Sequence, residues 1–190
     1  MASYTITAIN WNSASFWSSI SETTAGHTLD FSQLGPSYSL TVDQGTGTLT
    51  LSDGTQSFSV GQTSTTGTDA SFGTRSLLAY FTTIYGVDGT NLIDGTNAND
   101  TIVAFSQDDT LTGGEGDDAV FGGSGNDQID GQAGADTLYA DVGDDFVSGG
   151  AGADVIFGDA GDDQLEGGWQ DSAADTIIGG DGNDLVFGYG

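Results

Sequence analysis

Large aliphatic side chains recur at every ninth residue through the C-terminal half of the chain. From Gly86 to Phe187 the sequence divides into eleven consecutive units of nine residues, and only the tenth unit is longer, by three residues. Because alternate side chains of an extended segment face opposite sides, one aliphatic residue between two variable ones indicates a short strand of three residues. We expect these strands at position eight of each unit, around Ile93, Ile102, Leu111, Val120, Ile129, Leu138, Val147, Ile156, Leu165, Ile177 and Val186.

The other six positions of the unit are rich in glycine, as in GGEGDDAVF from Gly113 and GGSGNDQID from Gly122. Glycine at positions one, two and four permits positive φ, so six residues can turn tightly with carbonyl groups directed inward. Two units then complete a coil of eighteen residues, with a strand on each side of a thin aliphatic core. Stacked coils predict an all-β fold, a parallel β-roll of two short-stranded parallel sheets over residues 86–190.

Position six is an aspartate in ten of the eleven units. Because two units make one coil, position six of one unit lies beside position six of the next unit but one. Paired carboxylates with backbone carbonyls form an all-oxygen site, which suits Ca²⁺ better than Zn²⁺ or the stricter octahedral Mg²⁺. One edge of the roll aligns Asp100, Asp118, Asp136, Asp154 and Asp175, and the other aligns Asp109, Asp127, Asp145, Asp163 and Asp184.

Residues 1–85 lack the nine-residue period, and we expect them to form a separate small β-rich unit. Alternating segments at 38–42, 48–51 and 57–60 predict half-buried strands, the last two joined by a hairpin through residues 52–55. The spacing of Leu77, Phe81 and Ile84 before Gly86 predicts a short helix over 76–85. The larger apolar residues form either a core or an aromatic ligand cage; they are Trp11, Phe16, Trp17, Phe31, Leu34 and Phe58.

Charge narrows the range of partners. The chain has 28 acidic side chains against one basic residue, Arg75, and a formal net charge of −27. This charge opposes compaction and opposes binding to nucleic acid or an anionic membrane surface. The sequence has no apolar run long enough for membrane insertion and no cysteine for a disulfide or a thiolate site. Cations, calcium above all, are the expected partner.

The repeated unit resembles the RTX, or haemolysin-type, calcium-binding nonapeptide G-G-x-G-x-D-x-U-x, in which U is a large aliphatic residue. The resemblance covers a little over half of the chain and implies several Ca²⁺ ions held between consecutive turns. The expected metal ligands are the ten aspartates above and the backbone of glycines at positions two and four, namely Gly114, Gly116, Gly123, Gly125, Gly134, Gly143, Gly150, Gly152, Gly161, Gly180 and Gly182.

The resemblance also implies a secreted or cell-surface protein of a Gram-negative bacterium that is exported by type I secretion. The N-terminus agrees with that route, because it has no basic region followed by an apolar one, the mark of a cleavable signal. We expect calcium to be structural. Without it the stacked carboxylates repel, and one aliphatic residue in nine cannot offset a conformational entropy cost of about 1–2 kcal/mol per residue. The repeat half is therefore predicted to fold as the metal binds.

Departures from the repeat predict weaker sites at its two ends. Asn91 replaces an aspartate, Ala98 and Gln107 replace glycine at position four, and Ala104 with Phe105 replaces the glycine pair. The three-residue insertion around 169–174 distorts the tenth unit and puts binding at Asp175 in doubt. We expect the strongest sites between Asp118 and Asp163.

One sheet is predicted to be apolar on its outer face. Position nine of the even units is a large apolar residue, whereas the odd units mostly carry polar residues there. A broad apolar strip is unusual in water, so this ladder is either a surface for self-association or a protein partner, or it is explained by β-propensity or covered by the N-terminal unit. The ladder consists of Val103, Phe121, Tyr139, Phe157 and Ile178.

No catalytic constellation is evident, so we expect a structural or interaction module rather than an enzyme. The single histidine, His27, has no HExxH zinc motif or GxSxG elbow around it. The alternative is that the chain is a fragment of a larger RTX exoprotein, a secreted hydrolase or a Hint-type self-processing protein, whose effector domain lies elsewhere.

Overall fold

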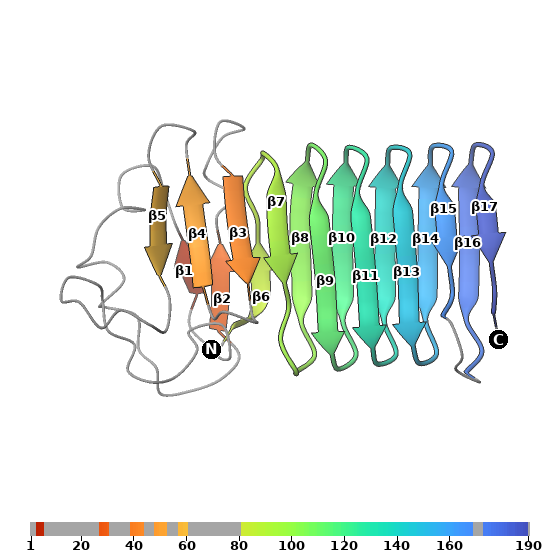
Figure 1. Ribbon diagram of the computed structural model, residues 1–190, viewed down its shortest axis with the longest axis horizontal. Helices are drawn as coiled ribbons and strands as arrows, with labels where there is room; N and C mark the ends of the chain where they lie inside the picture. Colours follow the sequence, from red (N-terminus) through yellow and green to blue (C-terminus); the bar gives the residue numbers. More distant parts are fainter. Residues whose placement is uncertain are drawn as a thin grey trace.

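The computed structural model describes residues 3–5, 27–30, 39–43, 48–52, 57–60, 81–168 and 173–189. These residues form strands and turns that stack into two sheets (Figure 1). No helix occurs among them, and so none that is long and apolar enough to cross a membrane. The prediction of an all-β fold is confirmed.

The first sheet, sheet A, has eight strands among the described residues, and all its neighbouring strands are parallel. In spatial order they are β1 (Ser3–Thr5), β2 (His27–Asp30), β6 (Phe81–Tyr85), β8 (Thr101–Ser106), β10 (Ala119–Ser124), β12 (Thr137–Val142), β14 (Val155–Ala160) and β16 (Thr176–Asp181).

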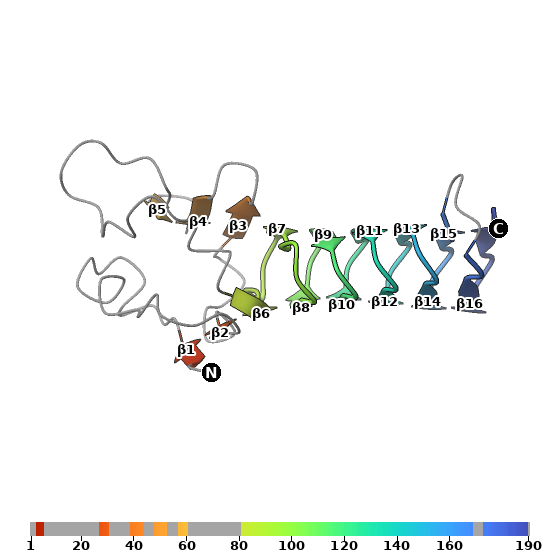
Figure 2. The same ribbon diagram turned by 90° about the horizontal axis from the view of Figure 1, so that it is seen from below.

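The second sheet, sheet B, has nine strands in the described part of the chain. Its parallel portion faces sheet A, and the chain crosses between the two layers at every turn (Figure 2). In spatial order the strands are β17 (Leu185–Phe187), β15 (Gln164–Glu166), β13 (Phe146–Ala151), β11 (Gln128–Ala133), β9 (Thr110–Glu115), β7 (Asn91–Asp94), β3 (Ser39–Asp43), β4 (Thr48–Ser52) and β5 (Ser57–Val60).

The register between coils is eighteen residues, as the two-unit coil predicts. Val120 of β10 lies beside Leu138 of β12, and Ile129 of β11 lies beside Val147 of β13. The strands are longer than the three residues expected, since most span six. The reason is that the chain stays extended from position seven through position three of the next unit, so that position one faces inward as well as position eight.

The core is a single row of aliphatic side chains between the sheets. Ile102, Val120, Ile129 and Leu138 are completely buried, and the position-eight residues from Ile93 to Leu165 share this burial. The exceptions are Ile177, which is partly exposed, and Val186, which is 47% exposed, because β16 and β17 are edge strands of sheets A and B. Each coil therefore buries only two large aliphatic side chains, which gives the roll a thin core.

The predicted helix over 76–85 is wrong where the structure describes it. Residues 81–85 form β6, a parallel strand that pairs with β8. Ile84 lies beside Ile102 and is 1% exposed, so it occupies the position-eight site of a coil that precedes the first recognisable repeat. Pairing with an existing sheet outweighs the local helical spacing of three apolar residues.

The strands predicted near the N-terminus are confirmed as β3, β4 and β5. β4 pairs antiparallel with both neighbours, and the hairpin to β5 follows the predicted order. β3 runs parallel to β7 and so extends sheet B of the roll. The choice between a core and an aromatic cage concerns side chains outside the described residues, and it stays open.

Candidate metal centres

The position-six aspartates lie in the turns that connect the two sheets. We call them the inner row of each edge. The row that leads from sheet B to sheet A begins at Asp100, and the row that leads from sheet A to sheet B begins at Asp109. The eight inner-row carboxylates from Asp100 to Asp163 are at most 3% exposed. Asp175 and Asp184, in the last coil, are only partly buried.

Each inner-row carboxylate after Asp100 is held by the preceding coil, whereas Asp100 accepts a hydrogen bond from the backbone N–H of Thr96 in its own turn. One oxygen, Oδ1, accepts a hydrogen bond from the backbone N–H of the aspartate eighteen residues earlier, as from Asp118 to Asp136 at 2.8 Å and from Asp127 to Asp145 at 2.7 Å. The same bond joins Asp154 to Asp175 at 3.0 Å and Asp163 to Asp184 at 3.2 Å, across the longer unit. The aspartates expected to be neighbours on each edge therefore lie in successive turns.

The second carboxylate oxygen has no hydrogen-bond partner. This holds for one buried oxygen on each of seven residues: Asp100, Asp109, Asp118, Asp127, Asp136, Asp145 and Asp163. An unpaired polar atom in the interior costs about 1–3 kcal/mol, and more when it is charged. Seven such atoms in two regular rows indicate that a partner of positive charge belongs in the turns.

A backbone carbonyl of the next coil shares the space beside the unpaired oxygen. A methyl group built on Gly113 would lie 2.5 Å from Asp118 Oδ2 and 2.8 Å from the carbonyl oxygen of Gly131. Equivalent pairs surround Gly122, Gly131, Gly149 and Gly158. Two acceptors that face one small space without a donor repel each other, and a cation between them removes the repulsion. The donor set, carboxylate and carbonyl oxygen, fits Ca²⁺.

Burial shifts the titration of the inner row. Loss of solvent raises the pKa of Asp109, Asp118 and Asp145 to about 7, against the opposing hydrogen bond from the preceding coil. The same cause raises the pKa of Asp127 and Asp136 to about 6, and it raises the pKa of Asp100 and Asp163 as well. The metal-free fold therefore favours protonated carboxyl groups near neutral pH.

No group of three or more His, Cys, Asp or Glu side chains gathers at one point in the described residues. The repeat explains this, because each turn supplies one carboxylate and its neighbour one more, and the remaining oxygens are carbonyls. The position-one residues, such as Gly131 and Ala140, were not predicted as ligands from the sequence, although their carbonyls adjoin the unpaired oxygens. The recurrence of position one at every ninth residue was the sequence signal that could have identified these carbonyls.

The glycines named as backbone ligands all adopt positive φ. Gly114, Gly123 and Gly150 at position two have φ of 117°, 106° and 103°, and the position-four glycines range from 112° to 148°. A side chain on any of them would meet a backbone carbonyl of the preceding coil. Their established role is therefore to let the coils stack. Metal contact by their carbonyls stays a prediction.

Five residues that replace a glycine of the repeat keep its backbone conformation, whereas Ala98 at position four does not adopt positive φ. Phe105 and Gln107 adopt φ of 83° and 72°, the left-handed conformation of the glycines that they replace. Gln132, Asp141 and Asp159 do the same at position two. Their strain, of order 1–2 kcal/mol per residue, must be offset by the stacking of the coils. The insertion at 169–172 lies outside the described residues.

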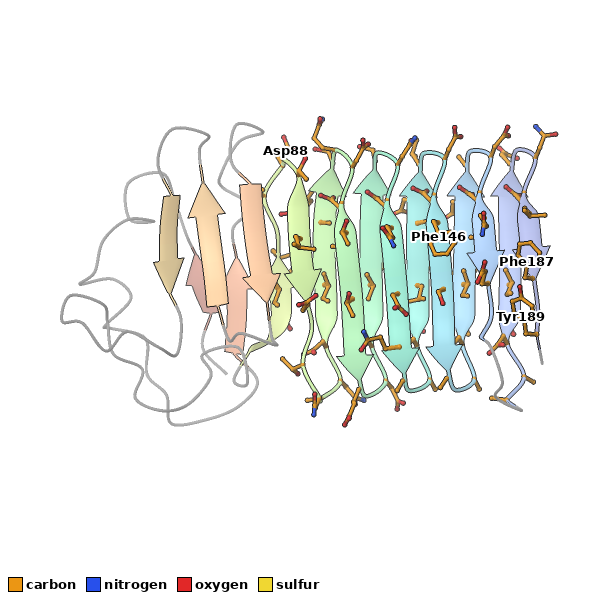
Figure 3. All side chains as sticks on the ribbon, viewed as in Figure 1. Asp88, Phe146, Phe187 and Tyr189 are labelled. Carbon is orange, nitrogen blue, oxygen red and sulfur yellow. The ribbon has the colours of Figure 1, made fainter. Side chains whose placement is uncertain are left out.

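The predicted apolar ladder lies on the outer face of sheet A. Phe121, Tyr139 and Phe157 stack with ring centroids 4.8 Å and 4.7 Å apart and planes within 3°. All three side chains are partly exposed, and Ile178 is 48% exposed. Sheet B carries Phe146 and Phe187, and Asp88 lies in the turn between β6 and β7 at the other end of the roll (Figure 3). That a partner covers the ladder stays a prediction.

Comparison with curated proteins found no match. The family model for the RTX calcium-binding nonapeptide repeat matches the chain in four copies, over residues 85–120, 112–147, 139–172 and 171–190. Together the copies cover residues 85–190 of 190, which is the part of the chain that forms the roll and its rows of buried carboxylates. The chain therefore belongs to the family of RTX calcium-binding nonapeptide repeat proteins.

Proposed function

We propose that this calcium-binding module is exported and that its roll folds as Ca²⁺ ions bind between consecutive turns. The single observation that carries the proposal is the set of seven buried carboxylate oxygens without a hydrogen-bond partner. The chain has one Lys or Arg residue, Arg75, against 28 acidic residues, so its own basic side chains are too few to pair with these oxygens. Only a cation from solution can fill that role.

The ligands we assign are the inner-row carboxylates and backbone carbonyls of the turns. In the turn at Asp118, for example, the unpaired Oδ2 and the carbonyl of Gly131 face one space, and Asp136 brings the carboxylate of the following coil. Bound Ca²⁺ supplies positive charge and accepts these oxygens as ligands. The residues orient the oxygens and keep water out, because the carboxylates are buried.

Folding on binding follows from the thin core. Each coil of eighteen residues buries two large aliphatic side chains, which contribute about 1.5–3 kcal/mol each, against an ordering cost of about 1–2 kcal/mol per residue. Ligands drawn from successive coils exist only in the folded state, so the free energy of binding becomes free energy of folding. Extracellular calcium modules work at about 10⁻⁴–10⁻³ M, above the calcium of a cytosol.

Folding that depends on calcium is useful to a protein that is exported from the cell. Proteins with RTX repeats are typically secreted by Gram-negative bacteria. A roll that stays unfolded at low calcium passes through a secretion channel as a chain and folds outside, where calcium is abundant. We assign the roll a structural role at the cell surface or in the medium, and no catalytic step to its described residues.

The test is direct calcium binding to two neighbouring variants. Asp145→Asn removes a buried inner-row charge, and Asp144→Asn removes an exposed charge one residue away. Asn at position 144 still accepts the backbone hydrogen bond from Asp162. Equilibrium dialysis of metal-stripped protein should show that Asp145→Asn binds one or two fewer Ca²⁺ ions than wild type, whereas Asp144→Asn binds the same number.

Magnesium at the same concentration serves as the ion control, and it should not replace calcium because it demands octahedral geometry. Equal loss of calcium from both variants would mean that net charge and not the inner row holds the ions. Equal binding of magnesium would contradict the assigned sites.

A further inference from the structure

Asn91 occupies position six of the first unit, where every later unit has an aspartate. Its side chain is 1% exposed, like the inner-row carboxylates. Four oxygen atoms surround its amide nitrogen within hydrogen-bond distance: the carbonyls of Val87 (3.1 Å), Gly89 (2.7 Å) and Ala104 (3.1 Å), and Oδ1 of Asp109 (3.0 Å). A nitrogen with two hydrogens thus stands at the centre of an oxygen cage.

The orientation of the amide is fixed by its neighbours. The backbone N–H of Val87 donates to Asn91 Oδ1 at 2.9 Å, and an N–H group can only donate, so the atom that faces it must be the oxygen. The atoms on the other side are three carbonyls and a carboxylate, which can only accept. The –NH₂ group must face them.

The same place two coils later lacks a donor. Asp127 is position six of the fifth unit, and its Oδ2 shares the space beside Gly122 with the carbonyl of Ala140. Ala140 follows Asp127 by thirteen residues, as Ala104 follows Asn91, so their carbonyls occupy equivalent places in the two turns. At Asp127 two acceptors face each other and need a cation. At Asn91 the amide donates to the equivalent carbonyl, and no cation is needed.

We propose that the Asn91 amide replaces the metal ion in the first turn, so that this turn closes without calcium. The inference rests on the proposed function, because it takes the later turns to hold Ca²⁺. The backbone N–H of Asn91 also donates to Asp109 Oδ1, at 2.6 Å. Asn91 therefore joins the first turn to the first carboxylate of its edge through both its backbone and its side chain. The first coil is thereby a metal-free template on which the calcium-dependent coils stack.

Its place in the fold suits this role. β7 begins at Asn91 and pairs with β3 on one side and with β9 on the other. The turn therefore lies where the N-terminal strands of sheet B meet the repeats. A template at one end gives folding a direction, from this turn towards the C-terminal coils, because each new site needs a formed neighbour to supply half of its ligands.

The experiment compares Asn91→Asp, Asn91→Ala and the charge-matched control Asn99→Asp, whose side chain is exposed at position five. Equilibrium dialysis in saturating calcium should show one additional Ca²⁺ ion in Asn91→Asp, and none in Asn91→Ala or Asn99→Asp. Amide hydrogen exchange in EDTA should show residues 86–94 of wild type better protected than residues 119–166. Both substitutions of Asn91, but not Asn99→Asp, should reduce that protection about tenfold or more.

An unchanged ion count in Asn91→Asp would overturn the inference, and so would wild-type residues 86–94 that are unprotected in EDTA. A roll that stays fully protected in EDTA would instead refute folding on calcium binding. The ion count of Asn91→Asp would still decide this inference in that case.

Discussion

Two rows of Asp and Asn side chains run along the same edge of the roll, one residue apart in the sequence, and they behave differently. The inner row includes Asp127, Asp145 and Asp163. The outer row, at position five, consists of Asp108, Asn126, Asp144, Asp162 and Asn183. Both rows accept backbone hydrogen bonds between coils. The inner row accepts from the coil before, as Asp145 does from Asp127, and the outer row from the coil after, as Asp144 does from Asp162.

The two rows differ in the surroundings of the side-chain oxygen that accepts no backbone hydrogen bond. Outer-row side chains are exposed, so water solvates the oxygen that makes no backbone bond. Hydrogen bonds from Asn183 lower the pKa of Asp162, whereas burial raises the pKa of Asp145 to about 7. Burial also raises the pKa of Asp163, so the two adjacent aspartates of the DD pair Asp162–Asp163 have opposite preferences. Burial of an unpaired oxygen, and not acidity itself, distinguishes the proposed metal ligands of the inner row from a surface charge.

The largest effect is expected from filling the space beside the inner row. Gly131 lacks a positive φ, so Gly131→Ala adds no backbone strain, but its methyl group would meet Asp136 Oδ2 and the carbonyl of Gly149. We predict the loss of one Ca²⁺ ion and a rise of about tenfold or more in the calcium concentration at the folding midpoint, which corresponds to about 1.4 kcal/mol. Gly188→Ala is the control, because open space surrounds Gly188. Equal midpoints for the two variants would show that the space is not used.

The next effect is a dependence on pH that belongs to the inner row alone. Folding raises the pKa of Asp118, Asp136 and Asp145 above 3.8, so protonation stabilises the metal-free fold. That stability is fully present below 3.8 and is lost as pH rises through about 6 to 7. We predict that metal-free protein gains β-structure by circular dichroism between about pH 8 and about pH 5.5.

Calcium should show the opposite trend, because Ca²⁺ must displace the protons. The calcium midpoint should rise as pH falls below about 7, the pKa of Asp118 and Asp145. The exposed outer row gives a control: replacing Asp144 with Asn should leave both pH profiles in place. A calcium midpoint that is independent of pH over this range would contradict ligation by the inner row.

A smaller effect on calcium binding, with a cost in stability, is expected from the apolar ladder on sheet A. Replacing Phe121 and Phe157 with Ser removes both stacked pairs of Tyr139, each worth about 0.5–1.5 kcal/mol. We predict a loss of about 1–3 kcal/mol in stability at fixed calcium, measured by denaturant unfolding. Phe146→Ser on sheet B is the control, and it should cost less. Light scattering of the same samples tests the predicted interface, which requires that the double variant lose mass relative to wild type.

The smallest effect is expected from the outer row. Changing Asp108, Asp144 and Asp162 together to Asn keeps an acceptor for each backbone bond and only lowers the like charge along the edge. Surface changes of this kind are worth about 0.5 kcal/mol or less, so the calcium midpoint should move less than about threefold. A loss of bound calcium in the triple variant would place ligands in the outer row and would remove the distinction between the rows.

Most of the roll could be predicted from the sequence because its geometry repeats. A fixed spacing of Asp118, Asp136 and Asp154 determines which carboxylates lie in successive turns, without any knowledge of the coordinates. The aliphatic position eight likewise determined the core, from Ile93 to Leu165. Local sequence and global fold agree at these positions, which is why the pattern alone sufficed.

Other features depend on contacts that the period does not contain. Ile84 lies in β6 although its neighbours have helical spacing, because the sheet extends one coil beyond the recognisable repeat. The six-residue strands and the carbonyls at position one follow from how far the chain stays extended after position eight. The amide of Asn91 looked like a defect in the sequence, and only the oxygen atoms around it show what it does.

The most direct test of the account is a calcium titration of the metal-stripped protein, followed by far-UV circular dichroism, with magnesium as the control ion. The account predicts a cooperative gain of β-structure with calcium, no comparable gain with magnesium, and full reversal on addition of EDTA. A protein that has its complete β-signal in EDTA and does not change with calcium would contradict the claim that the ions in the inner row fold the roll.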